Sequence, residues 1–218
     1  MVISTGTSSG KSLAYLLPIL TQMAKQEGST ALYLTPTKAL ATDQIRNVNA
    51  IIRGAGIPGV NPNAYDGDTP REVRRAVREM SRFIFTNPDM LHQAILPDHA
   101  RWSRFLRRLA FVVVDECHSY RGVFGAHMSQ VLWRFKRILA YYGATPVFIA
   151  ASATAADPGA HAARLLGVPV RAITRDGAPR GERTTILWTP GEETSATMEA
   201  AHILSLIHIS EPTRLLSI

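Results

Sequence analysis

The chain has almost no cysteine and no long apolar run. Its single cysteine, Cys117, excludes a disulfide within the chain. A lone thiol fits the reducing cytoplasm, where we expect the protein to be located. The longest apolar runs, such as residues 111–114, are far too short to span a bilayer, so we expect no membrane association. Residues 1–4 also lack the basic region that opens a secretory signal, and none is expected.

Acidic residues are the minority among the charged ones. The chain has 17 Asp and Glu against 24 Lys and Arg, a net charge of +7. This excess favours a polyanionic partner, because Lys and Arg that neutralise phosphates release counterions. The alternative is a basic surface that only keeps the protein in solution. Hydrophobic residues make up 46% of the 218 residues, enough for a core, so disorder is excluded.

Short apolar stretches alternate with helical patterns along the first 174 residues. The predicted strands are residues 2–5, 30–35, 63–65, 83–85, 111–114, 146–151 and 168–174. The predicted helices are residues 11–25, 36–53, 70–80, 131–142 and 158–166. In the first helix, the spacing predicts a buried face of Leu13, Leu16, Leu17, Leu20 and Met23. The alternation predicts an α/β fold with a mostly parallel central sheet and helices on both faces.

A glycine loop follows the first predicted strand and opens the first helix, which is the context of a phosphate-binding loop. Backbone N–H groups and the helix N-terminus bind phosphate oxygens in such a loop. We therefore expect these residues to bind ATP: Gly6, Thr7, Ser8, Ser9, Gly10, Lys11 and Ser12. Lys11 would contact the β- and γ-phosphates, and the hydroxyl of Ser12 would bind Mg²⁺. The match is not strict, since Thr5 stands where the pattern has glycine; the alternative is a glycine turn capped by Ser9.

Two adjacent carboxylates, Asp115 and Glu116, follow the apolar strand at residues 111–114. Ligands of open α/β sheets bind at the carboxyl ends of strands, so this position suits catalysis. Asp115 would hold Mg²⁺, directly or through water, and Glu116 would orient and deprotonate the water that attacks the γ-phosphate. With Lys11 they are the candidate catalytic residues. The alternative is a pair of solvated charges, which the preceding apolar strand argues against.

Five segments in order resemble the motifs of superfamily 2 helicases of the DExH type. They are GTSSGKS (6–12), PTKALA (36–41) as motif Ia, TNPDML (86–91) as motif Ib, DECH (115–118) as motif II and SAT (152–154) as motif III. With YDGDTP (65–70) and VVVDECHSYRGVFGAH (112–127), residues 2 to about 189 resemble the YprA/MrfA-type branch of bacterial DExH helicases. Each motif falls at a predicted strand end, and the order makes the resemblance specific.

The resemblance implies a RecA-like ATP-binding domain of an ATP-driven DNA helicase that moves 3′ to 5′ and is linked to DNA repair. Members carry a second RecA-like domain and a cysteine-rich C-terminal region. The residues that would contact the nucleic-acid backbone are Pro36, Thr37, Lys38, Thr86 and Asn87. The residues that would couple the nucleotide to movement between lobes are His118, Ser152 and Thr154. For Pro36 and Thr37 the other interpretation is a helix cap, which is compatible with nucleic-acid contact. For His118 the alternative is a packed core histidine.

Arginines gather in two stretches, and each has two interpretations. The stretches are Arg71, Arg74, Arg75, Arg78 and Arg82, and Arg101, Arg104, Arg107 and Arg108. They either contact DNA or form solvated helix faces. The tryptophans Trp102, Trp133 and Trp188 are interpreted as packing residues before base-stacking ones.

The resemblance also divides the chain. Residues 1–167 are expected to form the first RecA-like domain, with Met1 falling inside its first strand. Residues 168–203 are expected to connect it to a second RecA-like domain that is missing here. Residues 204–214 read LSLIHISEPTR, a peptide that a transposase adaptor of sequencing libraries can encode, so we expect residues 204–218 to be non-native.

Three functions remain to be separated. The first is an ATP-dependent helicase or translocase, with DNA preferred over RNA as the track. The second is a P-loop phosphotransferase, which leaves motifs Ia and Ib unexplained. The third is a non-catalytic nucleic-acid-binding module, against which Lys11 and Glu116 argue.

Overall fold

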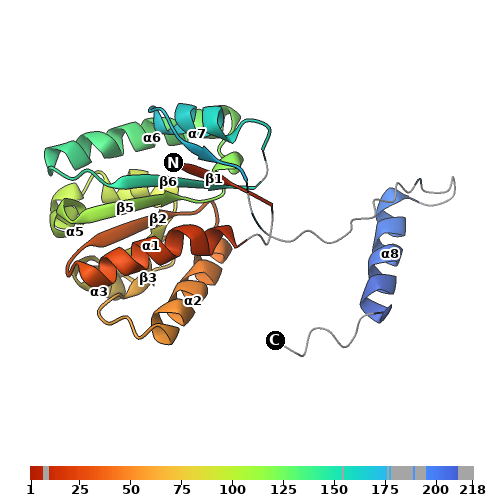
Figure 1. The fold of residues 1–218 in the computed structure, drawn as a ribbon, viewed down its shortest axis with the longest axis horizontal. Helices are drawn as coiled ribbons and strands as arrows, with labels where there is room; N and C mark the ends of the chain where they lie inside the picture. The colour runs from red at the N-terminus through yellow and green to blue at the C-terminus, as the bar shows by residue number, and fades with distance from the viewer. Residues whose placement is uncertain (7–9, 154, 176, 178–188, 190–194, 211–218) are drawn as a thin grey trace. The chain divides into compact units, whose positions relative to one another are not determined.

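The computed structural model describes residues 1–6, 10–153, 155–175, 177, 189 and 195–210. The chain divides into two compact units, residues 1–178 and 179–218. In the first unit seven parallel strands form one sheet in the order β3-β4-β2-β5-β6-β1-β7 (Figure 1). The strands are β1 (Val2–Ser4), β2 (Thr30–Leu34), β3 (Pro62–Ala64), β4 (Phe83–Thr86), β5 (Leu109–Val114), β6 (Val147–Ser152) and β7 (Ala172–Ile173).

Helices cover both faces of this sheet (Figure 1). One face carries α1 (Lys11–Lys25) and α2 (Lys38–Gly54). The other carries α3 (Arg71–Met80), α5 (Ser103–Arg107), α6 (Gly122–Tyr141) and α7 (Pro158–Leu166). Short turns complete the unit: α4 (Pro88–Met90), the π-helix η1 (Leu91–Ile95) and the 3₁₀ helices η2 (His99–Trp102) and η3 (Cys117–Ser119). The second unit contains α8 (Ala196–Ser210), and no helix among the described residues is both long and apolar enough to cross a membrane.

Alternation along the strands separates two apolar layers, because successive side chains point to opposite faces. On β5, Val112 and Val114 pack with α6 and α7, whereas Val113 packs with α1 and α2. All three are fully buried. A parallel sheet covered on both faces requires such continuous apolar runs. The predicted α/β class is confirmed, and the sheet is parallel throughout.

Three local predictions differ from the structure. Helix α6 begins at Gly122 rather than residue 131, and β7 covers two residues rather than 168–174. Glycines hid the start of α6, yet Gly125 is required there: a Cβ at this position would lie 2.5 Å from the carbonyl oxygen of Tyr120. The buried face of α1 is also rotated, since Tyr15 and Ile19 are buried while Leu13 and Leu17 are about half exposed.

The extent of the compact unit bears on the expected domain division. β7 pairs with β1 beyond residue 167, so the segment expected as a connector from residue 168 begins within the sheet. The division into a first domain, a connector and a non-native tail stays a prediction.

Candidate functional site

The first helix opens at a left-handed glycine at the carboxyl end of β1. Gly10 has φ +73°, and the next residue, Lys11, begins α1. The ammonium of Lys11 donates to the carbonyl oxygens of Ser152 at 3.0 Å and Thr5 at 3.4 Å. Lys11 therefore lies across the ends of the neighbouring strands β1 and β6. Of the other predicted loop residues, Thr7, Ser8 and Ser9 lie outside the described residues.

The carboxylate of Asp115 lies directly beyond β5 and is buried, with 5% of the residue's surface exposed. Its Oδ2 accepts a hydrogen bond of 2.7 Å from the hydroxyl of Tyr33, and its Oδ1 accepts one of 2.9 Å from the N–H of Glu116. Burial raises the pKa of Asp115, while both hydrogen bonds and the charge of Lys11 act in the opposite direction. A buried carboxylate with these contacts has a fixed orientation.

Glu116 has the one left-handed backbone conformation among the described non-glycine residues. Its φ is +47° and its ψ +41°. A non-glycine residue pays about 1–3 kcal/mol for such a conformation, and strain of this kind gathers at functional sites. Asp115 is buried beside this turn, whereas 28% of the Glu116 side chain is exposed.

His118 joins this turn to the end of β6. Its Nδ1 lies 3.1 Å from Oε2 of Glu116, 3.3 Å from the N–H of Ala153 and 3.4 Å from Oγ of Ser152. One nitrogen cannot serve all three: protonated Nδ1 donates to Glu116, and unprotonated Nδ1 accepts from Ala153. His118 is therefore a polar junction between motif II and motif III rather than a packed core histidine. The third predicted coupling residue, Thr154, lies outside the described residues.

Two buried tyrosines that connect to Asp115 through hydrogen bonds are not among the predicted site residues. The hydroxyls of Tyr15 and Tyr33 are 2.7 Å apart, and that of Tyr15 is 3.4 Å from Oγ of Ser12. Burial raises the pKa of both phenols, so both keep their protons. Their only signal in the sequence is a tyrosine among aliphatic residues in each of two buried elements.

The predicted nucleic-acid residues lie at the carboxyl ends of β2 and β4, which are neighbouring strands. Thr37 caps α2 by accepting from the N–H of Leu40 at 3.4 Å, so the helix-cap interpretation is correct for it. Asn87 caps α4 by accepting from the N–H of Met90 at 2.8 Å. The hydroxyl of Thr86 donates to the carbonyl oxygen of Tyr65 at 2.6 Å and is buried, so its side chain is not presented at the surface.

Lys38 forms an ion pair that the sequence motifs do not reveal. Its ammonium lies 2.5 Å from Oδ2 of Asp68, and both side chains are at least half exposed. The loop that carries Asp68 is organised by Asp66, whose Oδ1 accepts from the N–H groups of Asp68 and Thr69. The guanidinium of Arg74 donates to three carbonyl oxygens of the same loop, those of Asp66, Gly67 and Thr69.

Most arginines of the two predicted stretches have partners within the protein. Arg82 donates to the carbonyl oxygens of Met23, Gln26, Ser29 and Gly59. Arg104 donates to the carbonyl oxygen of Glu79, and Arg107 lies over the ring of Tyr142. Arg82 and Arg107 precede β4 and β5, at the opposite edge of the sheet from Asp115 and Asn87. These contacts favour a structural role for Arg82, Arg104 and Arg107. DNA contact by the other arginines of the two stretches stays a prediction.

The three tryptophans do not all fit the packing interpretation. Trp102 is buried and packs edge-on against Tyr65, as expected of a packing residue. Trp133 on α6 is 60% exposed, so the packing interpretation is wrong for it. Trp188 lies outside the described residues.

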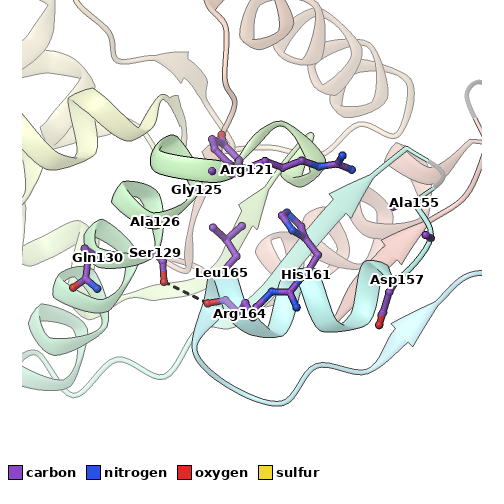
Figure 2. A pocket seen from close by; sticks show the side chains of 13 residues that line it. Arg121, Gly125, Ala126, Ser129, Gln130, Ala155, Asp157, His161, Arg164 and Leu165 are labelled. Atoms are coloured by element: carbon purple, nitrogen blue, oxygen red, sulfur yellow. Dashed lines mark hydrogen bonds between the residues drawn. The ribbon is translucent and has the colours of Figure 1, made fainter.

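A cavity of about 660 Å³ lies between α6, α7 and the segment after β6 (Figure 2). Arg121, His161 and Arg164 line it, and His161 is held by a contact of 2.7 Å between its Nε2 and the carbonyl oxygen of Cys117. Lys11, Asp115 and Glu116 do not line this cavity. It is therefore separate from the strand ends that carry the candidate catalytic residues.

The described residues provide an ammonium, a buried carboxylate and a hydroxyl at one edge of the sheet. Oxygen donors such as Asp115 and Ser12 suit Mg²⁺, which keeps several waters and binds proteins through one or two carboxylates and a substrate phosphate. Within the described part of the chain, no cluster of three or more His, Cys, Asp or Glu could hold a metal by itself. The donor set therefore fits a Mg²⁺ ion that arrives with a nucleotide.

Comparisons with known proteins place these residues in a family context. The DEAD/DEAH box helicase family model matches residues 1–161. The chain is 46% identical over 190 residues to the uncharacterized ATP-dependent helicase YprA of Bacillus subtilis (strain 168), covering 87% of this chain and 25% of YprA. It is 43% identical over 196 residues to the ATP-dependent helicase HRQ1 of Saccharomyces cerevisiae (strain ATCC 204508 / S288c), covering 87% of this chain and 18% of HRQ1.

A solved structure resembles the chain over most of its length. The crystal structure of the DUF1998 helicase MrfA bound to DNA and AMPPNP has a TM-score of 0.85 and 41% identity, and the match covers 96% of this chain and 30% of that one. This likeness confirms the predicted RecA-like fold. The chain spans a quarter or less of YprA and HRQ1.

Proposed function

The chain belongs to the DEAD/DEAH box helicase family, and from this premise we propose that it is the ATP-binding first lobe of a helicase that acts on DNA. One observation carries the proposal: Lys11, Ser152 and Asp115 come together at the ends of the adjacent strands β1, β6 and β5. An ammonium and a fixed carboxylate at one sheet edge suit a nucleotide triphosphate.

Each residue at the edge has a proposed task. Lys11 exchanges its two carbonyl partners for the β- and γ-phosphate oxygens. Ser12 and Asp115 would hold Mg²⁺, which supplies charge stabilisation on the phosphates when bound. Glu116 orients the attacking water and accepts its proton. His118, through its alternative contacts with Glu116 and Ala153, transmits the state of the site to the end of β6.

The nucleic-acid track is proposed along the ends of β2 and β4. Pro36, Thr37, Lys38 and Asn87 are at least partly exposed there, whereas Thr86 can contribute its backbone only. Backbone contacts of this kind carry no sequence information, as a translocating motor requires. MrfA is bound to DNA and AMPPNP in its crystal structure, which supports DNA and ATP as the ligands of this chain.

The proposal extends to the division of the chain. Residues 1–167 would be the first RecA-like domain, residues 168–203 a connector to a second one, and residues 204–218 a non-native tail. A second lobe would supply a positively charged group that stabilises the negative charge on the transferring phosphoryl group. The buried thiol of Cys117 suits the cytoplasm as the place of action.

DNA-stimulated ATP hydrolysis tests the function. In the proposed division these residues form only the first lobe, so we expect the 218-residue chain to bind Mg²⁺–ATP weakly and to hydrolyse it poorly. The uninterrupted protein, meaning the proposed helicase with both of its lobes, should hydrolyse ATP faster when single-stranded DNA is added. A phosphotransferase would instead pass phosphate to a small acceptor without any response to DNA. Robust DNA-stimulated ATP hydrolysis by the 218-residue chain alone would contradict the proposal that it is only the first of two lobes.

A further inference from the structure

Two tyrosine hydroxyls lie in an apolar layer where phenylalanine would pack equally well. Tyr15 on α1 and Tyr33 on β2 are 1% and 0% exposed. Their neighbours in this layer include Ile19, Phe83 and Phe85, and the ring of Tyr33 stacks on that of Phe85 with centroids 4.7 Å apart. Burying a hydroxyl costs free energy unless it forms hydrogen bonds. The two hydroxyls therefore need an explanation beyond packing.

The hydroxyls form a continuous path between two groups of the candidate ATP site. Tyr33 donates to Oδ2 of Asp115 at 2.7 Å, and the hydroxyls of Tyr33 and Tyr15 are 2.7 Å apart. A further 3.4 Å separates the hydroxyl of Tyr15 from Oγ of Ser12. The path joins Ser12, in the helix that follows the phosphate loop, to Asp115 at the end of β5. Asp115 is 82 positions from Tyr33 along the chain.

The path ends on an acceptor at each side. Ionised Asp115 only accepts, so Tyr33 donates to its Oδ2. At the other end the hydroxyl of Tyr15 donates to Oγ of Ser12 at 3.4 Å. The two phenols between them are 2.7 Å apart, and either hydroxyl can be the donor. A serine oxygen has two lone pairs, so one remains for a cation when Tyr15 donates to the other.

We infer that Tyr33 and Tyr15 are positioning residues that hold the two Mg²⁺-binding groups of the ATP site, Asp115 and Ser12, in orientation before Mg²⁺–nucleotide binds. This inference rests on the proposed function. Tyr33 has the larger effect, because its hydrogen bond to Asp115 is short and that of Tyr15 to Ser12 is long. Neither tyrosine touches nucleotide itself.

The test separates Mg²⁺ binding from nucleotide binding. The affinity of the chain for a fluorescent, non-hydrolysable ATP analogue is measured in Mg²⁺ and again in EDTA, for the wild type and for Tyr33→Phe, Tyr15→Phe and the double variant. In the wild type, Mg²⁺ strengthens binding. We expect Tyr33→Phe to reduce that strengthening about tenfold, the scale of losing a group that orients a metal ligand. Tyr15→Phe should reduce it about threefold, and affinity in EDTA should stay within about twofold of the wild type.

Two further comparisons keep the inference open to refutation. The double variant should lose little more than Tyr33→Phe alone, because the hydroxyls act as one path. Tyr142→Phe is the matched control: its buried hydroxyl contacts His99 at 2.8 Å, at the other edge of the sheet, and its loss should change neither affinity. Thermal unfolding shows that each variant is folded, and Tyr15→Phe provides the answer should Tyr33→Phe fail to fold.

The outcomes are distinguishable. If the wild type binds the analogue with Mg²⁺ dependence but Tyr33→Phe and Tyr15→Phe match it, the inference is overturned and the proposed function stands. If both variants lose affinity equally in Mg²⁺ and EDTA, the tyrosines are only structural, and the inference is again overturned. If the wild type itself shows no nucleotide binding, the proposed function fails and the inference falls with it.

Discussion

The ammonium of Lys11 donates a hydrogen bond of 3.0 Å to the carbonyl oxygen of Ser152. This contact joins the start of α1 to the end of β6, 141 positions along the chain. Its acceptor is neutral, whereas a phosphate oxygen is charged, so the ammonium gains the attraction between opposite charges when it moves to a phosphate. Nucleotide binding should therefore draw Lys11 away from Ser152 and leave this carbonyl to a new partner.

Lys11→Ala should weaken the binding of the ATP analogue by roughly 10- to 100-fold, since hydrogen bonds to charged groups contribute about 1.5–3 kcal/mol. Fluorescence titration in Mg²⁺ measures the loss. Lys25→Ala is the control, because Lys25 is an exposed lysine at the other end of the same helix. Equal affinities for the two variants would remove Lys11 from the phosphate site.

Glu116→Gln should abolish hydrolysis while nucleotide binding persists. Glutamine has the same size and can adopt the same backbone turn, but it cannot accept a proton from water. Loss of a general base lowers turnover by about 10²- to 10⁴-fold. DNA-stimulated ATP hydrolysis and unwinding by the uninterrupted protein are the measurements. Glu79→Gln serves as the control, since Glu79 is exposed and its carboxylate forms an ion pair with Arg75. Unwinding at the normal rate by Glu116→Gln would show that another group is the base.

Asp68→Asn should strengthen binding to single-stranded DNA by about two- to fivefold at low salt, because it frees the charge of Lys38 for a phosphate. Lys38→Ala should do the reverse and reduce the slope of log affinity against log salt by about 0.7. Fluorescence anisotropy over a range of salt concentrations measures both.

Asp43→Asn controls for the change in net charge, because Asp43 is exposed and pairs with Arg46 on α2. If Asp43→Asn and Asp68→Asn raise affinity equally, the effect is one of overall charge, and the ion pair with Lys38 has no special part in DNA binding.

Patterns of apolar residues predicted the α/β class and the strand ends at which the candidate site lies. Such patterns report burial, so Val112, Val113 and Val114 indicated a strand, and Asp115 after it indicated a strand end. They do not report how far a helix extends through glycines, which is why the start of α6 at Gly122 was missed. Nor do they report where a hydroxyl points inside a core.

Contacts between residues far apart in the chain could not be predicted from the sequence either. Tyr33 reaches Asp115 only because β2 and β5 are neighbours in the sheet, and the chain order of the strands does not give that pairing. The ion pair of Lys38 with Asp68 depends on a loop that Arg74 holds through backbone carbonyls. Each of these contacts follows from strand order and loop geometry, which short motifs do not contain.

The thiol of Cys117 gives a prediction for stability at high pH. The side chain is fully buried, and burial raises the pKa of the thiol from 9.0 to about 11. Because the folded state disfavours the thiolate, this contribution to stability is complete below pH 9 and is lost as pH rises through about 11. Two pKa units correspond to about 2–3 kcal/mol, so the free energy of unfolding should fall by that order between pH 9 and 11.

Cys117→Ala isolates the effect of the thiol, because every other ionisable side chain is the same in both proteins. At pH 8 the variant should be less stable by about 1 kcal/mol, because a buried sulfur atom is replaced by a small void. As the pH rises to 11, the wild type should lose this advantage and become the less stable of the two. Urea unfolding at pH 8, 9, 10 and 11 measures the difference. A constant gap between the two proteins over this range would show that Cys117 ionises as easily in the fold as in the unfolded chain, and that its burial has no influence on its pKa.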